Sequence, residues 1–406
     1  MRMEIAMTLP TGEEPSAGPL QGTRVLDLTR LMPGNYSTWV LASFGADVIK
    51  VEDPGAGDYM RSFGVQVNGQ GALHHLVNRA KRSIVIDLKA AEGREAFLRL
   101  VDTADVVVES FRPGVLDRLG VGFDVLRRRR PRLVYANLSG YGPTGPLARR
   151  AAHDLNYVAF SGLLHHLGTP ASAPPVPPVA VADLIGGGLN TALAVMALLL
   201  RAQRTGVGGR ADTALAEGAA LVPSNLVADL LGGLPEPDQG TAEYAGAVPV
   251  YSVYALRDGY VTVGAVEPQF WRAVCDLLGE PELVERRADA EFVRERLTAR
   301  FATLTRTEAR ELFAGDDTCV EVVQTYTEAF ASPHAKELGY LQDVPGLDMP
   351  VTAAPYLIDG VRPAETVPAP VQGQHTREVM AELGYTDAHL DDLQRRAVLA
   401  PRRTAG

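Results

Sequence analysis

The chain has 406 residues, of which 46% are hydrophobic and 22% charged, so it is long enough for a sizeable core and for two or three domains. Its 39 Lys and Arg residues against 49 Asp and Glu give a net charge of −10, which argues against nucleic acid or an anionic membrane surface as a partner. Two cysteines cannot build a disulfide framework or a cysteine-based metal site, and their scarcity suits a reducing compartment.

The N-terminal residues 1–20 are expected to be a flexible leader. Glu4, Glu13 and Glu14 stand where a signal peptide would need an apolar run. The most apolar stretch of the chain, residues 189–200, is about a dozen residues long, which is too short to cross a bilayer. We therefore expect a soluble, cytoplasmic protein without membrane contact.

Residues 21–230 are predicted to form a large, Rossmann-like α/β domain, in which short runs of Val, Ile and Leu alternate with helix-like segments. The expected strands are residues 23–28, 47–52, 83–88, 105–110, 132–139 and the first part of 209–218. The expected helices are residues 35–45, about 90–101, and much of 153–205 outside a Pro-rich stretch. Apolar strands that alternate with helices are typical of a parallel sheet covered on both faces.

A smaller α+β domain is predicted for residues 240–335, after a linker rich in Gly and Pro at 232–240. Asp258 and Gly259 between two alternating apolar runs indicate a β-hairpin, and residues 268–330 are mostly helical in pattern. Residues 336–406 are expected to return to the large domain and to end in a polar helix around 376–395.

Familiar catalytic and phosphate-binding motifs are missing from the sequence. It contains no G-x-x-x-x-G-K-[ST] loop, no G-x-G-x-x-G after a strand and no G-x-S-x-G elbow. The eight histidines fall in no metal-binding spacing, so we expect neither a metal site nor a cofactor.

Three acid–base candidates remain. His153 precedes an apolar helix, Asp183 opens an apolar segment with three glycines, and Glu267 ends an apolar strand before Pro268. Each has a purely structural explanation, as a helix cap or a solvated strand end. The functional alternative for Asp183 is that the glycines leave room for a ligand, with backbone N–H groups that stabilise a developing oxyanion.

Taken in order, these segments resemble the family III coenzyme A transferase superfamily, also called CaiB/BaiF-like, and within it the α-methylacyl-CoA racemases. The resemblance spans about residues 18–395 and is carried by the stretches 18–54, 78–89, 108–122, 132–146, 153–162, 181–188 and 263–271, with a weaker echo at 373–385. It implies an α/β fold and a substrate that carries coenzyme A.

Three positions favour the racemase branch of that superfamily. Transferases use an aspartate at the Asp183 position as a nucleophile, whereas racemases keep it and add a histidine in H-D-x-N-Y and a glutamate in G-A-x-E-P-Q-F. This chain has His153 and Glu267 in those contexts, and YAGAVPVY at 244–251 replaces the transferases' Gly-rich loop.

The resemblance implies a two-base reaction at the carbon α to the thioester. His153 and Asp183 would remove and return a proton on opposite faces, each within hydrogen-bond reach of that carbon. Glu267 would hydrogen-bond His153, fix its tautomer and stabilise its charged form. The backbone amide of Asp183 would stabilise the enolate oxygen.

The resemblance also implies a CoA site on the large domain. An arginine is a suitable fork for phosphate. The implied contacts are Lys50, Ile86, Asp87, Leu88, Lys89, Arg112, Arg118, Ala152, Asp154 and Tyr157. Racemases often have Arg where Asp53 stands here, so one phosphate contact is either absent or supplied by Lys50.

We therefore expect a racemase or epimerase of 2-methylacyl-CoA thioesters that acts as a homodimer, because relatives interlock as dimers. The first alternative is a CoA transferase that works through an anhydride on Asp183. The second is a catalytically silent CoA-binding or scaffold protein, which the retention of His153, Asp183 and Glu267 disfavours.

Overall fold

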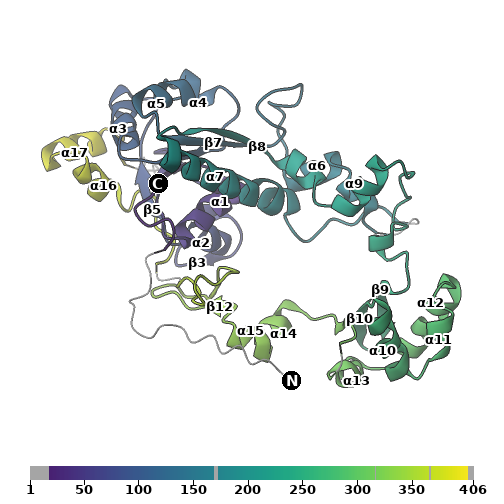
Figure 1. Cartoon of the computed structure of the whole chain (residues 1–406). Helices are drawn as coiled ribbons and strands as arrows, with labels where there is room; N and C mark the ends of the chain where they lie inside the picture. The colour runs from purple at the N-terminus through teal and green to yellow at the C-terminus, as the bar shows by residue number, and fades with distance from the viewer. Residues whose placement is uncertain (1–17, 169–171, 316, 365–366, 401–406) are drawn as a thin grey trace. The chain divides into compact units, whose positions relative to one another are not determined.

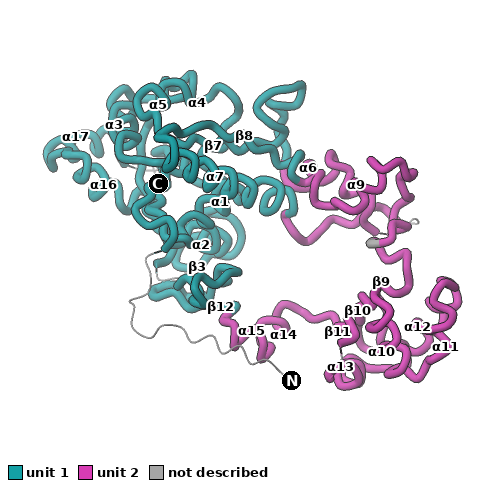
Figure 2. The backbone as a smooth tube through the Cα atoms, in the orientation of Figure 1, with its two compact units in different colours: residues 1–152, 181–218, 340–406 teal, residues 153–180, 219–339 magenta. Residues whose placement is uncertain are grey.

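The structure is a computed structural model that describes residues 18–168, 172–315, 317–364 and 367–400, so most of the predicted leader lies outside the described residues. The described chain divides into two compact units (Figure 2). The large unit contains the described residues up to Ala152, then Val181–Gly218, then the described residues from Tyr340 onward. The second unit contains the described residues of His153–Ala180 and Ala219–Gly339.

Six strands of the described chain form one sheet in the large unit, in the order β5-β2-β1-β6-β7-β8, and each neighbouring pair is parallel. Their bounds are β1 Arg24–Leu28, β2 Asp47–Glu52, β5 Arg82–Val85, β6 Val106–Glu109, β7 Val134–Ser139 and β8 Gly209–Ala214. The predicted α/β class is confirmed. The predicted strand at 83–88 is shorter, because it ends at Val85 and Ile86 begins a loop.

Helices cover both faces of this sheet. Successive strand residues point to opposite sides, so apolar strands supply a core on each face. Leu26 faces one core with Phe97 and Leu100 of α3, while Val25 faces another with Trp39 of α1 and residues of α7. Before its C-terminal segment, the large unit contains the helices α1 Leu31–Ser43, α2 Ala72–Asn78, α3 Ala91–Val101, α4 Val115–Arg118, α5 Phe123–Arg129 and α7 Asn190–Thr205. Helix α8 Leu215–Ala220 begins in the large unit, and its last two residues belong to the second unit. Short pieces are η1 Tyr59–Ser62, η3 Ala182–Leu189, β3 Gln66–Val67, β4 Gln70–Gly71, β12 Leu341–Gln342 and β13 Val351–Thr352.

The C-terminal segment packs into the same core as α3. Val379 and Met380 of α16 (Thr376–Glu382) and Leu390 of α17 (Asp387–Arg395) belong to the cluster that holds Phe97. The sequence predicted one helix here, but Gly384 adopts φ +83°, a left-handed conformation that ends α16.

The second unit is built around a three-stranded antiparallel sheet, in the order β11-β10-β9, within the described residues. The predicted hairpin is present as β9 Tyr251–Leu256 and β10 Gly259–Gly264. Strand β11 Val320–Val322 was missed, because three residues are too few to show an alternating pattern. The helices are α6 Asp154–Phe160, η2 Leu163–His166, α9 Ser224–Leu231, η4 Glu243–Ala245, α10 Pro268–Leu278, α11 Glu282–Glu285, α12 Ala290–Phe301, α13 Arg306–Phe313, α14 Tyr326–Ala331 and α15 Pro333–Glu337.

The division of the chain differs from the predicted boundaries at two places. The stretches 153–180 and 219–230 were assigned to the large domain, whereas the structure groups their described residues with the second unit. The chain leaves the sheet after β7 and returns for η3, α7 and β8, and a helical pattern in the sequence does not report such an excursion.

One helical segment of the described chain, Ala182–Thr205, is long and apolar enough to cross a membrane by length and composition alone. The sequence estimate of about a dozen residues was too short, because the helix begins at η3. A core helix of a soluble protein passes the same test, and α7 packs on β7 and β8 through residues such as Val195 and Leu199 (Figure 1).

Candidate active site

The carboxyl ends of the parallel strands gather polar residues at one edge of the large sheet. Arg30 follows β1, Asp53 follows β2, Lys89 lies in the loop after β5, and Arg112 follows β6. The strand order reverses between β1 and β6, and ligands of open α/β sheets bind at such a switch point. The backbone N–H of Arg30 donates to Ser110 Oγ at 3.1 Å, which ties the two loops together at that point.

A cavity of about 260 Å³ lies at this edge, lined by Arg30, Asp53, Pro54, Gly55, Asp87 and Lys89. Arg30 donates through Nη2 to Asp53 Oδ2, and its guanidinium lies 5.6 Å from the ring centroid of Phe111. The sequence predicted Asp87 and Lys89 as contacts but missed Arg30. Its position two residues after the first strand, at the switch point, is the signal that could have found it.

Lys50 is held inside the fold, which corrects its predicted role as a phosphate contact. Its side chain is 0% exposed, and Nζ pairs with Asp58 Oδ2 at 2.9 Å. Nζ also donates to the Thr29 carbonyl at 3.0 Å and to Asn35 Oδ1 at 2.6 Å, so each of its N–H groups has an acceptor. Burial opposes the charged form, yet the nearby carboxylates, Asp58 first, raise the pKa of Lys50.

The other predicted CoA contacts of the large unit are spread along the loops after β5 and β6. The side chain of Ile86 is buried in the core, which leaves only backbone to meet a ligand, whereas Lys89 is exposed. Arg112 is exposed after β6, and Arg118, also exposed, ends α4. Asp87 and Leu88 are half-buried.

Asp183 lies in the first turn of η3, a π-helical segment, and is half-buried. Wide turns of this kind are frequent at functional sites. Room for a ligand beside Asp183 stays a prediction, and the fold packs closely against two of the neighbouring glycines. A Cβ at Gly187 would lie 2.9 Å from the Leu138 side chain, and one at Gly188 would lie 2.9 Å from the Pro33 carbonyl oxygen.

His153 occupies the N-cap position of α6 and is exposed. Its backbone N–H donates to Asn156 Oδ1 at 3.0 Å, which fixes the chain at the start of the helix. Of the predicted contacts beside it, Asp154 is the first residue of α6, Tyr157 is buried and Ala152 is half-buried. The predicted capping position is therefore real, and an exposed imidazole at a helix start is also free of core packing.

Glu267 is the N-cap residue of α10, directly before Pro268. Strand β10 ends at Gly264, and two residues separate Glu267 from it, so Glu267 begins a helix and does not end the strand as the sequence predicted. Its residue is exposed, and its carbonyl accepts from the Trp271 N–H at 3.0 Å. His153 and Glu267 belong to the second unit and Asp183 to the large unit.

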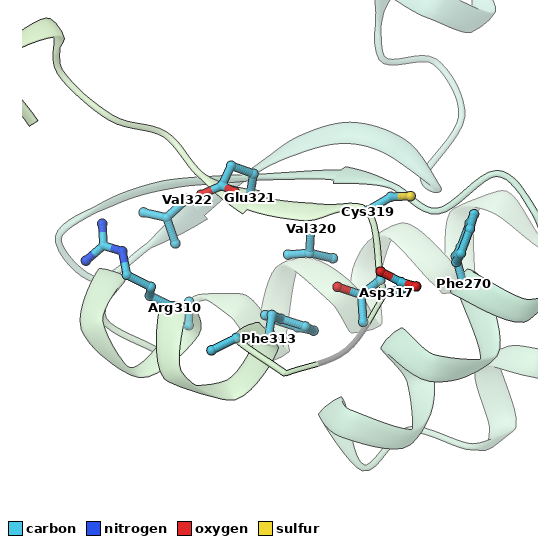
Figure 3. A pocket seen from close by; sticks show the side chains of 11 residues that line it. Phe270, Arg310, Phe313, Asp317, Cys319, Val320, Glu321 and Val322 are labelled. Carbon is cyan, nitrogen blue, oxygen red and sulfur yellow. The ribbon is translucent and has the colours of Figure 1, made fainter. Parts of the chain in front are cut away.

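A larger cavity, of about 590 Å³, lies in the second unit between α13 and β11 (Figure 3). Phe270 and Cys319 stand at one end and Arg310 at the other. None of the described residues that line it was a predicted site residue. Within the described ranges, no group of three or more His, Cys, Asp or Glu side chains is placed to hold a metal ion.

Comparisons with known proteins place this geometry in context. The sequence profile of CoA-transferase family III matches residues 20–376. The chain is similar to alpha-methylacyl-CoA racemase of Homo sapiens, with 36% identity over 372 residues that cover 90% of this chain and 94% of the racemase. It is also similar to succinyl-CoA:glutarate CoA-transferase of Mus musculus, with 33% identity over 412 residues that cover 97% of this chain and 93% of the transferase.

The crystal structure of a CAIB/BAIF family protein from Brucella suis aligns with a TM-score of 0.80 at 30% identity, over 90% of this chain and 100% of that protein. Racemases and transferases thus resemble the chain to a similar degree, so the reaction type has to be argued from the side chains of the site.

Proposed function

The chain belongs to CoA-transferase family III, and from this premise we propose that it is a racemase or epimerase that inverts the α-carbon of 2-methylacyl-CoA thioesters. The superfamily contains both racemases and transferases of similar identity to this chain. The proposal therefore concerns the choice between racemase and transferase, and it assigns His153 and Asp183 as the acid–base pair.

The exposed imidazole of His153 at the start of α6 carries the proposal. A transferase that forms an anhydride on Asp183 needs no histidine there, whereas inversion of a carbon needs a second proton-transfer group. Its N-cap position fixes the backbone and leaves the imidazole outside the core.

The proposed reaction moves one proton off the α-carbon and another on. One group of the pair removes the α-proton, and the electron pair of the C–H bond moves into the thioester carbonyl to give an enolate. The other group then donates its proton to the opposite face of the same carbon. An imidazole and a carboxylate can each act as base in one direction and as acid in the other.

Two further groups assist in this scheme. The Asp183 backbone N–H, in the first turn of η3, is the proposed donor to the enolate oxygen, since N–H groups at a helix start favour negative charge. Glu267 is the proposed partner of His153, and its exposed N-cap position leaves its carboxylate available for that contact.

A CoA transferase is the second candidate. It is favoured by the 33% identity to a succinyl-CoA:glutarate CoA-transferase over 97% of this chain and by the carboxylate of Asp183. In that reaction the Asp183 carboxylate would attack the thioester carbonyl, expel CoA as a thiolate and carry the acyl group as an anhydride.

Proton exchange separates the two candidates. We expect the α-hydrogen of a 2-methylacyl-CoA to be replaced by deuterium in deuterated water, seen by NMR, with no second carboxylic acid present. Exchange or inversion that starts only when an acceptor acid is added would contradict the racemase. A hydroxylamine-sensitive adduct on Asp183 would do the same.

The proposal includes a homodimer. None of the residues of α9 is buried within the described chain, although Leu230 and Leu231 are apolar and Leu231 is 81% exposed. An apolar helix without a buried face is typical of an interface. We expect light scattering after gel filtration to give twice the 43.4 kDa of one chain, and Leu231→Glu to shift the protein toward the monomer.

A further inference from the structure

The Arg30–Asp53 ion pair stands where a ligand of the large sheet would bind. Its side chains are 33% and 39% exposed and line the cavity at the carboxyl ends of β1 and β2. A guanidinium at the switch point of an open α/β sheet is a fork for phosphate, and CoA carries phosphate groups. In this structure, however, Asp53 Oδ2 accepts from Nη2 of that fork.

The geometry points to Asp53 as a built-in competitor of the CoA phosphate for Arg30: the carboxylate occupies the guanidinium until a phosphate group displaces it. Asp53 thereby lowers CoA affinity, and Arg30 is the residue that binds the phosphate. This inference rests on the CoA-dependent activity proposed above and names the residues that set the strength of CoA binding.

Arg30 is prepared for a ligand by its surroundings. Its guanidinium lies 5.6 Å from the Phe111 ring centroid and 5.9 Å from that of Tyr59, so aromatic rings restrict its motion. Lys89 is the second cation that lines the cavity, and Asp87 is a second carboxylate. The side-chain charges of the cavity therefore cancel while Asp53 is paired, and removal of the Asp53 charge leaves it positive.

Other hydrogen bonds hold Asp53 in position when its contact with Arg30 is broken. Its Oδ1 accepts from the Gly55 N–H at 2.7 Å, a local turn that does not involve Arg30. Its backbone carbonyl accepts from Gln372 Nε2 at 2.9 Å. A carboxylate that is more than one-third exposed returns to water at little cost, whereas a dianionic phosphate gains a stronger charge-assisted contact.

The matched control is another Arg–Asp pair of the large unit. Asp102 follows α3 and accepts from Arg129 at 2.6 Å, with side chains 45% and 35% exposed, close to those of the proposed pair. It lies before β6, at the amino ends of the strands, which is the edge opposite the cavity. Asp102→Asn removes the same charge from a similar environment.

The test is the dissociation constant of CoA itself, measured by calorimetry at low salt on the full chain. Asp53→Asn keeps an acceptor for the Gly55 N–H and should lower the dissociation constant by about 3–10 fold, an effect that shrinks as salt screens it. Arg30→Met should raise it about tenfold or more, the scale of one lost charge-assisted hydrogen bond. Asp102→Asn should leave it within about twofold.

Related ligands identify the phosphate. If the 3′-phosphate binds Arg30, the Arg30→Met effect vanishes with 3′-dephospho-CoA, and if the pyrophosphate binds, the effect persists. Weaker CoA binding in Asp53→Asn, or unchanged binding in Arg30→Met, overturns the inference. Arg30→Lys, which keeps a cation, should fall between wild type and Arg30→Met. Wild-type protein that binds CoA with this pattern but exchanges no α-proton contradicts the racemase alone.

Discussion

Lys50 of the large unit and His153 of the second unit are both basic side chains in stretches that carry the family resemblance, but their surroundings differ. Lys50 is 0% exposed and held by Asp58, whereas His153 is exposed at the start of a short helix. The first is therefore part of the scaffold, whereas the second lies at the surface. A charged residue in a motif shows its role only when its burial is known.

The buried charges of the large unit fix the loop that presents Arg30. Asp58 Oδ1 accepts from the Leu31 N–H at 3.2 Å, and Leu31 has φ 64°, a left-handed conformation that costs energy for a leucine. Lys50 holds Asp58 in place at 2.9 Å. Interior charge thus serves local geometry, while the exposed side chains of the second unit meet solvent.

The largest expected effect tests the proposed proton transfer by His153 and Asp183. His153→Asn keeps a good N-cap for α6, and Asp183→Asn keeps the shape of its side chain, so the fold should persist. Each change should lower racemisation by roughly 10²–10⁴ fold, because each removes one of two proton-transfer groups. Racemisation is followed by optical activity and exchange by NMR in deuterated water.

His389→Asn is the control, since His389 is exposed on α17, and it should leave turnover unchanged. Slow exchange of the α-proton can persist in one single mutant, because the remaining base still serves its own face. Full racemisation in either His153→Asn or Asp183→Asn would remove that residue from the pair.

The next largest effect tests the structural role of Lys50. Lys50→Met leaves the Asp58 carboxylate buried without its cation, which should lower the free energy of unfolding of the large unit by about 3–5 kcal/mol. The protein's two tryptophans are Trp39 in the large unit and Trp271 in the second unit. In a Trp271→Phe background, Trp39 fluorescence therefore reports urea unfolding of the large unit.

Two companion variants sharpen that measurement. Lys50→Met combined with Asp58→Leu removes both charges and should recover part of the lost stability. Lys89→Met changes an exposed lysine and should alter the free energy of unfolding by no more than about 0.5 kcal/mol. Equal effects of Lys50→Met and Lys89→Met would erase the distinction between buried and exposed lysines.

Much of the large unit could be predicted from the sequence because buried parallel strands are continuous Val, Ile and Leu runs. The stretches at 47–52 and 132–139 became β2 and β7 on that basis. Short or interrupted elements could not be predicted. Strand β11 has three residues, and Gly384 divides the expected terminal helix.

The candidate site was predictable at element ends and unpredictable inside elements. His153 stands at the helix start that its neighbours in the sequence indicated, whereas Glu267, predicted to end a strand, begins α10. Lys50 was misinterpreted because the pairing with Asp58 joins segments that no local pattern connects. Arg30 was missed because its importance depends on which strands are neighbours, a property of topology.

A smaller effect is expected at Glu267, the proposed partner of His153. Glu267→Gln should lower turnover about tenfold, the scale of one charge-assisted hydrogen bond, and leave the dissociation constant of CoA within about twofold. The measurement is kcat against CoA binding. Glu291→Gln removes a carboxylate from the first turn of α12 and should leave both quantities unchanged. Equal loss of turnover in both variants would point to a general charge effect.

The smallest effect concerns a buried residue of the large unit, His74, and the loss of folding stability at low pH. His74 is 0% exposed, and Asn78 Nδ2 lies 3.1 Å from its Nδ1. Burial first, and then the positive charges of Arg61 and Lys50, hold the pKa of His74 far below its ordinary value of 6.5. Below about pH 6.5 the unfolded chain binds a proton that folded His74 does not, so stability falls with pH, by at most about 1.4 kcal/mol per pH unit.

In the Trp271→Phe background, we therefore expect His74→Gln to lose less stability than its parent when the pH is lowered from 7.0 to 5.5. The loss of stability should be smaller by about 1 kcal/mol, because glutamine has no proton to gain on unfolding. His389→Gln replaces an exposed histidine and should follow the parent. The same acid slope in His74→Gln and parent would show that other groups control the response. A smaller loss of stability in His74→Gln alone would show that burial keeps the His74 imidazole unprotonated in the folded protein.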